Sequence, residues 1–452
     1  FIKNPHRKQP VVKASRFNTF AVLDNGNKIL FNSQTGALAE LDADSYSKVS
    51  AILEDPVGEF ADDNSQVRQQ LLYGGFLVED YLDQIAAQKI EYARQRYGKG
   101  ILRLAIAPTL ECSLLCDSCS GRKHKMRIRL SAEKFLTKFI DNHARRADQI
   151  EVTYFGGDPL LEIDTMERIQ AHLADSAARH GIPLRAATVI TNGTLLDRVM
   201  ALRLKEAGVL GAQVTLNGPR EMHNQSRKLS DGEGSFGRII SNISDSAVIL
   251  DVVVRINLSS VNVGDVSAIL DSLRQVGVLS KVRVCLTSGR GKAEVCTDAV
   301  GLCRQGEQDL KNHLSAYSEL SGQSQLRLDF PFLIAEPSCP TDCDSSFIIA
   351  PSGYVFKCWE DVSAMVDNSV DTIFDRPVDA FQHQNLMKYT LQDRLDNNNC
   401  KTCAILPVCR GGCAVDICEQ TEPMSGKCKF WRDNLQDLLK LRHLYETREE
   451  AT

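Results

Sequence analysis

Six short apolar runs, separated by amphipathic stretches, lie between residues 100 and 290. We expect a buried strand at each run, over residues 101–107, 149–155, 184–190, 211–216, 250–256 and 281–286. Helical patterns separate them, such as residues 130–147, with Ser131 as N-cap, and residues 263–277, ending at Gly277. Repeated strand–helix units predict an α/β fold, in which a parallel sheet closes partway into a (β/α)6 TIM-type barrel. A ligand would then lie at the C-terminal ends of the strands.

Different patterns flank these units. Near the N-terminus, Asn25-Gly26 between apolar arms predicts a hairpin with a two-residue type I′ turn. Two short helices follow, over residues 42–53 and 66–78, the second with a Gly74-Gly75 stop. After residue 322 the chain becomes rich in Cys, Gly and Pro and loses its periodicity. We therefore divide the chain into an N-terminal module (1–97), a barrel (98–304), a bridging helix and linker (305–332) and a C-terminal domain (333–452).

Charge and hydropathy exclude several kinds of partner. The net charge is 53 − 58 = −5, with the signs mixed along the chain, which argues against binding nucleic acid or anionic lipid. The longest apolar runs, such as residues 248–254, are far shorter than the roughly 20 residues that span a bilayer. The first residues contain no apolar segment typical of a signal peptide. We expect a cytoplasmic protein without a membrane or nucleic-acid partner.

The 15 cysteines are gathered mostly in two groups, which is typical of metal ligands in a large chain without a secretory signal. The first group directly follows the first predicted strand and has the spacing CxxxCxxC: Cys112, Cys116 and Cys119. A structural zinc site takes four protein ligands, whereas a [4Fe–4S] cluster held by three cysteines keeps one iron open for another ligand. A zinc loop or incidental cysteines are the alternatives.

This motif, in the loop after the first strand of an incomplete barrel, resembles that of the radical S-adenosylmethionine (SAM) enzymes. The resemblance implies that the amino and carboxylate groups of SAM bind the open iron. It also implies that one electron, from a flavodoxin or ferredoxin, cleaves SAM to a 5′-deoxyadenosyl radical. Ser118 stands where the family usually has an aromatic residue.

Three further segments resemble SAM-binding motifs of the same family. TYFGGDPLL is similar to the GGEP motif, which assigns to the SAM amino group Gly156, Gly157 and Asp158. The segment ITNGTLL, with Asn192, and the segment LNGPREMH, with Asn217 in place of the usual Asp, resemble the family's next two strand ends. Arg255 on the fifth strand is the candidate for the SAM carboxylate or ribose; a purely structural arginine is the alternative.

The second cysteine group resembles the SPASM extension of this family. Nine cysteines lie between residues 339 and 428, so two sets of four leave one over. The resemblance assigns to auxiliary [4Fe–4S] cluster one Cys339, Cys343, Cys358 and Cys413. It assigns to auxiliary cluster two Cys400, Cys403, Cys409 and Cys428, and Cys418 is left over. Zinc ribbons use similar pairs and are the alternative. Three remaining cysteines are incidental or quench a substrate radical: Cys285, Cys296 and Cys303.

Two auxiliary clusters would let an electron leave a substrate radical, which favours net two-electron oxidation. SPASM members mostly act on peptides, and the N-terminal module resembles the winged-helix-like recognition elements (RRE) of ribosomal-peptide maturases. Such elements bind a leader peptide as an added strand; a cap that only stabilises the barrel is the alternative. The resemblance therefore implies an oxidoreductase that installs a thioether or carbon–carbon cross-link in a precursor peptide.

Glu360 and Asp361, beside Cys358, are the candidate catalytic bases, unless they are structural or solvent-facing acids. A formylglycine-generating oxidase is a second hypothesis, although those members carry an acid where this chain has Trp359. A peptide epimerase is a third, and would need a cysteine as hydrogen donor. An iron–sulfur electron carrier or a peptide-binding scaffold without chemistry is the alternative from outside the enzymes.

Overall fold

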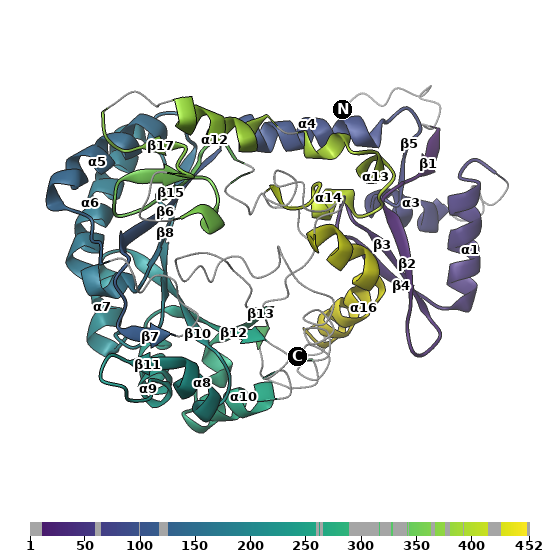
Figure 1. Cartoon of the computed structure of the whole chain (residues 1–452). Helices are drawn as coiled ribbons and strands as arrows, with labels where there is room; N and C mark the ends of the chain where they lie inside the picture. The colour runs from purple at the N-terminus through teal and green to yellow at the C-terminus, as the bar shows by residue number, and fades with distance from the viewer. Residues whose placement is uncertain are drawn as a thin grey trace.

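The computed structural model describes residues 11–58, 65–98, 100–116, 125–258, 262, 265–288, 316, 327–328, 341, 343–362, 367–375, 380–391, 393–414 and 426–449. Its main sheet has the strand order β14-β13-β12-β10-β9-β8-β6-β15-β16-β17 (Figure 1). Six parallel strands form the centre: β6 (Ile101–Thr109), β8 (Gln149–Gly156), β9 (Ala187–Thr191), β10 (Val209–Leu216), β12 (Asp251–Leu258) and β13 (Arg283–Ser288). The six predicted strands and their parallel arrangement are confirmed.

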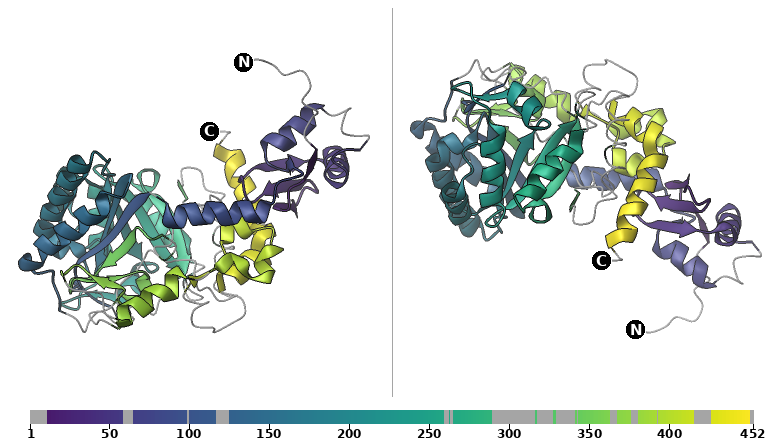
Figure 2. Two further views of the ribbon diagram at one scale, coloured as in Figure 1. Left: turned by 90° about the horizontal axis from the view of Figure 1, so that it is seen from above. Right: turned by 90° about the horizontal axis from the view of Figure 1, so that it is seen from below.

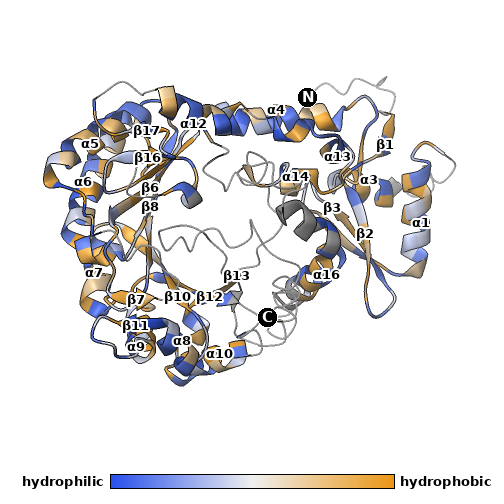
Figure 3. Cartoon of the chain, in the orientation of Figure 1, coloured by the Kyte–Doolittle hydropathy of each residue, from blue (hydrophilic) through white to orange (hydrophobic). Residues whose placement is uncertain are grey.

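The two faces of the sheet bury different side chains because strand residues alternate between faces. On β6, Leu102, Leu104 and Ile106 belong to the core under the outer helices, whereas Ala105 and Ala107 belong to a second core inside the barrel. The outer face is covered by α5 (Leu130–Ala144), α6 (Ile163–His180), α7 (Arg198–Glu206), α9 (Phe236–Ser246) and α10 (Val266–Gln275) (Figure 1). These helices carry hydrophilic outer surfaces, while the strands are largely hydrophobic (Figure 3).

The helix boundaries follow local signals only in part. The stop at Gly277 is confirmed: its φ is 72°, and Val278 N–H donates to the Leu273 carbonyl at 3.1 Å. The N-cap at Ser131 is wrong, because α5 begins at Leu130 with Arg129 as N-cap and no side-chain capping bond. The packing of Leu136, Phe139 and Ile140 in the core under the sheet stabilises this helix although its start has no side-chain cap.

The main sheet continues into the cysteine-rich region. Strand β15 (Ser346–Ile349) pairs in parallel with β6, and β16 (Tyr354–Phe356) and β17 (Asp371–Thr372) extend the sheet antiparallel. On the opposite edge, β14 (Arg327–Leu328) pairs with β13. The helices that follow are α12 (Ala380–Thr390), α13 (Asn398–Lys401), α14 (Leu406–Cys409) and α16 (Gly426–Glu449). Sequence periodicity missed β15 because four residues are too few to establish a pattern.

The described residues of the N-terminal module before α4 form two small antiparallel sheets and two helices. One sheet has the order β2 (Asn18–Val22), β3 (Lys28–Asn32) and β4 (Leu38–Leu41); the other pairs β1 (Val12–Ala14) with β5 (Leu77–Glu79). The helices are α1 (Ala43–Glu54) and α3 (Ser65–Tyr73). The hairpin at Asn25-Gly26 is confirmed, but its type I′ turn is wrong. Only Gly26 has a positive φ, of 87°, and Leu23 N–H donates to the Asn27 carbonyl at 2.8 Å, which closes a three-residue loop.

Helix α4 (Gln84–Tyr97) runs from the N-terminal module to the barrel (Figure 2). At its start, the buried Gln84 donates to Ser15 Oγ at 2.8 Å; at its end, Tyr97 donates to the Thr390 carbonyl at 2.8 Å. Helix α16 covers the β2–β3 sheet, where the fully buried Leu439 joins Ala21, Ile29 and Phe31. The module is therefore packed against the C-terminal region.

The predicted bridging helix 305–322 lies outside the described residues except for the buried Ala316. Among the described helices, none is both long and apolar enough to cross a membrane.

Candidate functional site

The cysteine loop leaves the C-terminal end of β6 and is held by a short two-stranded ladder. Strand β7 (Leu114–Cys116) pairs antiparallel with β11 (Arg227–Leu229), which follows α8 (Arg220–Ser226). In this register Cys116 lies opposite Arg227, and directly opposite side chains share one face of a ladder. Arg227 is only 4 % exposed, so a buried cation lies on the Cys116 side. Cys119 lies outside the described residues.

The two glycines at the end of β8 pack on the backbone of the cysteine loop. A Cβ on Gly156 would lie 2.1 Å from the Thr109 carbonyl oxygen, and a Cβ on Gly157 would lie 2.2 Å from the Glu111 carbonyl oxygen. Gly157 N–H also donates to the Thr109 carbonyl at 3.1 Å. The close approach of the cysteine-loop backbone therefore requires glycine at both positions. The approaching group is protein backbone and not a ligand. A direct contact of these residues with SAM stays a prediction.

Asp158 is fully buried between three strand ends. Its Oδ1 accepts a hydrogen bond from Thr191 at 2.8 Å, and its Oδ2 accepts one from Ser113 at 3.3 Å. Burial raises the pKa of this carboxyl group, partly offset by the hydrogen bonds from these hydroxyls. The carboxylate thus ties the ends of β8 and β9 to the cysteine loop, and its predicted role toward the SAM amino group stays a prediction.

Asn192, at the end of β9, contacts the cysteine loop directly. Its Nδ2 donates to Cys112 Sγ at 3.4 Å and to Ser113 Oγ at 2.9 Å. Cys112 keeps exposed surface as a residue, but its sulfur lies among these polar groups. Burial of the thiol, together with the nearby Asp158 carboxylate, raises the pKa of Cys112 to about 12. A bound cation such as iron would therefore have to displace the proton.

A second polar cluster lies at the ends of β10 and β12. Asn257 Nδ2 donates to Asn217 Oδ1 at 3.0 Å, and Arg255 Nε donates to Asn257 Oδ1 at 3.0 Å. Arg255 is only 4 % exposed. Asn217 and Arg255, which were both singled out from the sequence, are thus joined through Asn257, which was not. The role of Arg255 toward SAM stays a prediction.

His223 links this cluster to the ladder beside Cys116. It is fully buried, and burial together with the nearby Arg227 charge lowers its pKa to about 3. Its Nδ1 accepts from Asn217 N–H at 3.3 Å, so Nε2 carries the proton that faces Ser235 Oγ at 3.0 Å. Ser235 in turn donates to the Arg227 carbonyl at 2.7 Å. Neutral His223 therefore fixes β11 and, through it, the cysteine loop.

The candidate bases beside Cys358 lie in a short helical turn, Trp359–Asp361. The Asp361 carboxylate is buried and accepts a hydrogen bond from the Tyr389 hydroxyl, which is a structural contact. The Glu360 side chain lies outside the described residues. Trp359 packs edge-on against Phe155 inside the barrel, with ring centroids 4.7 Å apart. A catalytic role for Glu360 or Asp361 stays a prediction.

Lys357, which the sequence analysis missed, organises the loop between two predicted ligands. It is 1 % exposed, and its Nζ donates to three backbone carbonyls, those of Cys343, Asp344 and Ser346, at 2.7, 2.9 and 2.8 Å. An ammonium group has three donors, so these bonds use all of them. No motif predicted a buried lysine here, because only the folded loop supplies its acceptors.

The auxiliary cysteines are only partly described. Cys339 and Cys418 lie outside the described residues, as do Cys296, Cys303 and the side chain of Cys428. Within the described part of the chain, no three or more His, Cys, Asp or Glu side chains form a group that could hold a metal ion. The described members of the two predicted quartets are thus not gathered into metal sites, and the auxiliary clusters stay predictions.

Part of the chain matches a model of a known protein family. Residues 106–272 match the model of the radical SAM superfamily. An Fe-coproporphyrin III synthase of Methanosarcina barkeri is 30 % identical over 196 residues, which are 42 % of this chain and 45 % of that protein. The chain thus spans less than half of that relative.

Two further relatives match over most of their length. The radical SAM cyclopropyl synthase TigE of Paramaledivibacter caminithermalis is 21 % identical over 94 % of this chain and 93 % of its own. The structure of anSMEcpe with bound AdoMet and Cp18Cys peptide aligns with a TM-score of 0.57 at 15 % identity, covering 78 % of this chain and 99 % of that one. The second likeness shows a shared fold.

The donor set at the cysteine loop fits an iron–sulfur cluster held by thiolates. Two thiols of the motif lie at the C-terminal end of β6, with an amide donor on Cys112 and the buried Arg227 opposite Cys116 in the β7–β11 ladder. The family match covers the strands from which this loop and its supports arise. Residues 106–272 therefore form a radical SAM domain.

Proposed function

We propose that this protein is a radical SAM peptide maturase. It abstracts a hydrogen from a ribosomally made precursor peptide and installs a thioether or carbon–carbon cross-link by net two-electron oxidation. The observation that carries the proposal is the cysteine loop, held at the C-terminal strand ends by Asn192, Asp158 and the β7–β11 ladder. When bound there, a [4Fe–4S] cluster with one open iron supplies the electron that cleaves SAM.

Relatives support a peptide substrate. TigE is a cyclopropyl synthase by name, and the aligned anSMEcpe structure holds a peptide together with AdoMet. The interior packing of Trp359 against Phe155 puts an aromatic ring where formylglycine-generating members carry an acid. This difference favours cross-linking over formylglycine formation.

The N-terminal module supports leader binding, because β4 is a free sheet edge among the described strands. In the β2–β3–β4 sheet, β4 pairs only with β3, while Gln436 of α16 donates to the Phe20 carbonyl on β2. Asn32 N–H donates to the Ala37 carbonyl, so alternation along β4 turns the N–H groups of Leu38 and Glu40 away from β3. An extended leader peptide would pair with these groups.

The leader site is tested by Leu38→Pro, which removes one outward N–H but leaves the β3–β4 ladder bonds in place. We expect precursor-peptide affinity, measured by fluorescence anisotropy, to fall about tenfold, the loss of one backbone hydrogen bond (~1.4 kcal/mol). Val22→Pro is the matched control, because Val22 lies on the opposite edge strand and is exposed. Equal affinities for Leu38→Pro and wild type would contradict strand addition at β4.

The reaction itself is tested by the mass of a precursor peptide encoded beside the gene. The peptide is incubated without oxygen with reconstituted enzyme, reductant and SAM, in ordinary and in heavy water. Loss of two hydrogen masses per event, absent in Cys116→Ala, supports the cross-linking maturase. An unchanged mass that becomes one deuteron heavier in heavy water would mean epimerisation, and no change with wild-type enzyme would refute both.

The proposal includes the two auxiliary clusters and a flavodoxin or ferredoxin as electron donor. Three [4Fe–4S] clusters require about twelve iron atoms per chain after reconstitution, and one cluster requires about four. An iron content near four atoms per chain would contradict the two auxiliary clusters. Deoxyadenosine formation in the wild type, lost in Cys116→Ala, separates the enzyme from a scaffold without chemistry.

A further inference from the structure

We propose that Asn192 is a positioning residue whose amide orients Cys112 and donates a hydrogen bond to its sulfur in the cluster-bound state. The inference rests on the proposed function only in taking Cys112 as a cluster ligand. It assigns the side chain of Asn192 to the protein's own thiolate, whereas the sequence resemblance pointed to SAM.

The orientation of the Asn192 amide is fixed by its neighbours. Its Oδ1 accepts two hydrogen bonds from Thr194, one from the backbone N–H at 2.8 Å and one from the hydroxyl at 2.7 Å. A flipped amide would turn NH₂ toward the backbone N–H, where two donors would face each other. Nδ2 must therefore point to the cysteine loop, as it does toward Cys112 Sγ and Ser113 Oγ.

These four hydrogen bonds use the full capacity of a primary amide. Its carbonyl oxygen has two lone pairs and its NH₂ group has two hydrogens, and all four are engaged within the chain. Asn192 is also only 4 % exposed. Its side chain therefore has no further donor or acceptor to offer a cofactor without losing a bond it already makes.

The turn that carries Asn192 is anchored from two sides. Asn242 on α9 donates to the carbonyls of Gly193 and Thr194 at 2.8 and 3.0 Å. Thr191, the preceding residue, accepts from Gly193 N–H at 3.1 Å and donates to the buried Asp158 at 2.8 Å. The amide thus has a fixed place on the barrel, which lets it set the position of the more exposed cysteine loop.

A donor on a ligating sulfur has a measurable electrostatic effect. Reduction adds a negative charge to an iron–sulfur cluster and its thiolates, and an N–H···S bond stabilises that charge. Asn192 therefore makes the cluster easier to reduce. Losing the donor lowers the equilibrium constant for reduction, and replacing it by a carboxylate oxygen lowers the constant further.

The test compares Asn192→Asp and Asn192→Ala with wild type. Aspartate keeps an oxygen for the two Thr194 donors and removes only the NH₂ group, so the turn stays anchored. We expect the equilibrium constant for cluster reduction to fall about tenfold, a shift of ~59 mV for one electron. The readout is a redox titration of the EPR signal that changes on adding SAM. Reductant-driven cleavage of SAM without peptide should slow in parallel.

Asn385→Asp is the matched control, because Asn385 on α12 also donates two amide hydrogen bonds, to the Asp367 and Ser369 carbonyls, outside the site. Loss of about four iron atoms from Asn192→Asp, with a control-like circular dichroism spectrum, would also support the inference. If Asn192→Asp does not fold, the same two measurements on Asn192→Ala test the inference.

Two results would overturn the inference, and they differ. In the first, wild type forms the cluster and cleaves SAM, but both variants have an equilibrium constant for cluster reduction and a rate of SAM cleavage within twofold of the wild-type values. Asn192 then does not position Cys112 for the cluster, while the proposed function stands. If wild type reconstitutes no SAM-responsive cluster, the proposed function falls together with the inference.

Discussion

At the scale of single residues, buried polar groups hold the site together by engaging one another. Asp158, Asn192 and His223 are each less than 5 % exposed, and each bonds groups from a different strand end or helix. Leaving any such group without its partner costs about 1–3 kcal/mol. These residues therefore couple the stability of the barrel's end to the position of the cysteine loop.

His223 makes that stability dependent on pH. Its pKa is about 3 in the folded protein and about 6.5 when unfolded. Between these values only the unfolded chain binds the proton, so the free energy of unfolding falls as the pH falls below 6.5. From pH 7 to pH 5, wild type should lose about 2 kcal/mol more than His223→Gln in urea unfolding. Equal losses would mean that His223 is protonated in the folded protein.

At the scale of elements, the site is made where loops from adjacent strands touch. Gly157, after β8, approaches the backbone of the β6 loop so closely that a Cβ would lie 2.2 and 2.4 Å from two carbonyl oxygens, those of Glu111 and Leu110. The GGDP segment was identified from its sequence, as a predicted contact to the SAM amino group. Its packing on the backbone of the β6 loop could not be predicted, because that packing depends on the parallel pairing of β6 with β8.

We expect Gly157→Ala to displace the cysteine loop. The added methyl group costs about 3 kcal/mol if the loop stays in place, because both opposing atoms belong to the backbone. The variant should therefore retain the fold but lose about four iron atoms per chain on reconstitution. Gly100→Ala is the control, since the nearest atom to its added Cβ is 3.9 Å away. Full iron content in Gly157→Ala would show that the loop adapts.

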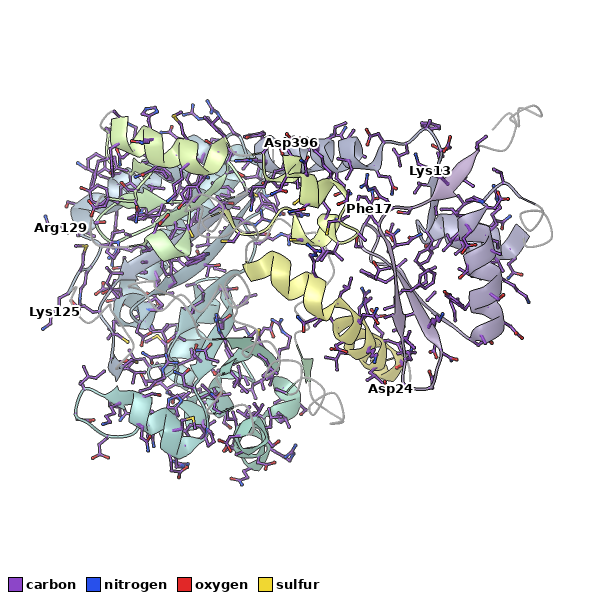
Figure 4. All side chains as sticks on the ribbon, turned by 45° about the vertical axis from the view of Figure 1, so that its right-hand side comes forward. Lys13, Phe17, Asp24, Lys125, Arg129 and Asp396 are labelled. Atoms are coloured by element: carbon purple, nitrogen blue, oxygen red, sulfur yellow. The ribbon has the colours of Figure 1, made fainter. Side chains whose placement is uncertain are left out.

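At the scale of the whole molecule, the N-terminal module and the cysteine-rich region pack on each other. Phe17 of the module joins Tyr92 of α4 and Leu406 of α14 in one apolar cluster (Phe17 is labelled in Figure 4). The cluster also borders Cys400 and Cys403. Ser33 donates to the Ala404 carbonyl and Arg16 to the Lys401 carbonyl. The module is thus packed directly against the segment that carries two of the cysteines predicted for auxiliary cluster two.

Leu439→Asp tests this packing. Leu439 is fully buried between α16 and the β2–β3 sheet, and a carboxylate there loses the packing and buries a charge, at a cost of about 4 kcal/mol or more. We expect the module to detach, with a larger radius of gyration in small-angle scattering and faster proteolysis at α4. Leu444→Asp, on the same helix but 44 % exposed, should behave as wild type. An unchanged scattering profile for Leu439→Asp would contradict the packing.

The sequence by itself determined the six parallel strands, the cysteine loop after the first of them and the radical SAM domain, because apolar periodicity and motif spacing are local properties of the chain. Tertiary structure decided what lies against that loop. Ser113 contacts Thr194, 81 residues away, Arg227 lies opposite Cys116 on the partner strand of one ladder, and β15 joins β6 across more than 230 residues. Such contacts depend on which strand ends meet, and only the folded sheet brings those ends together.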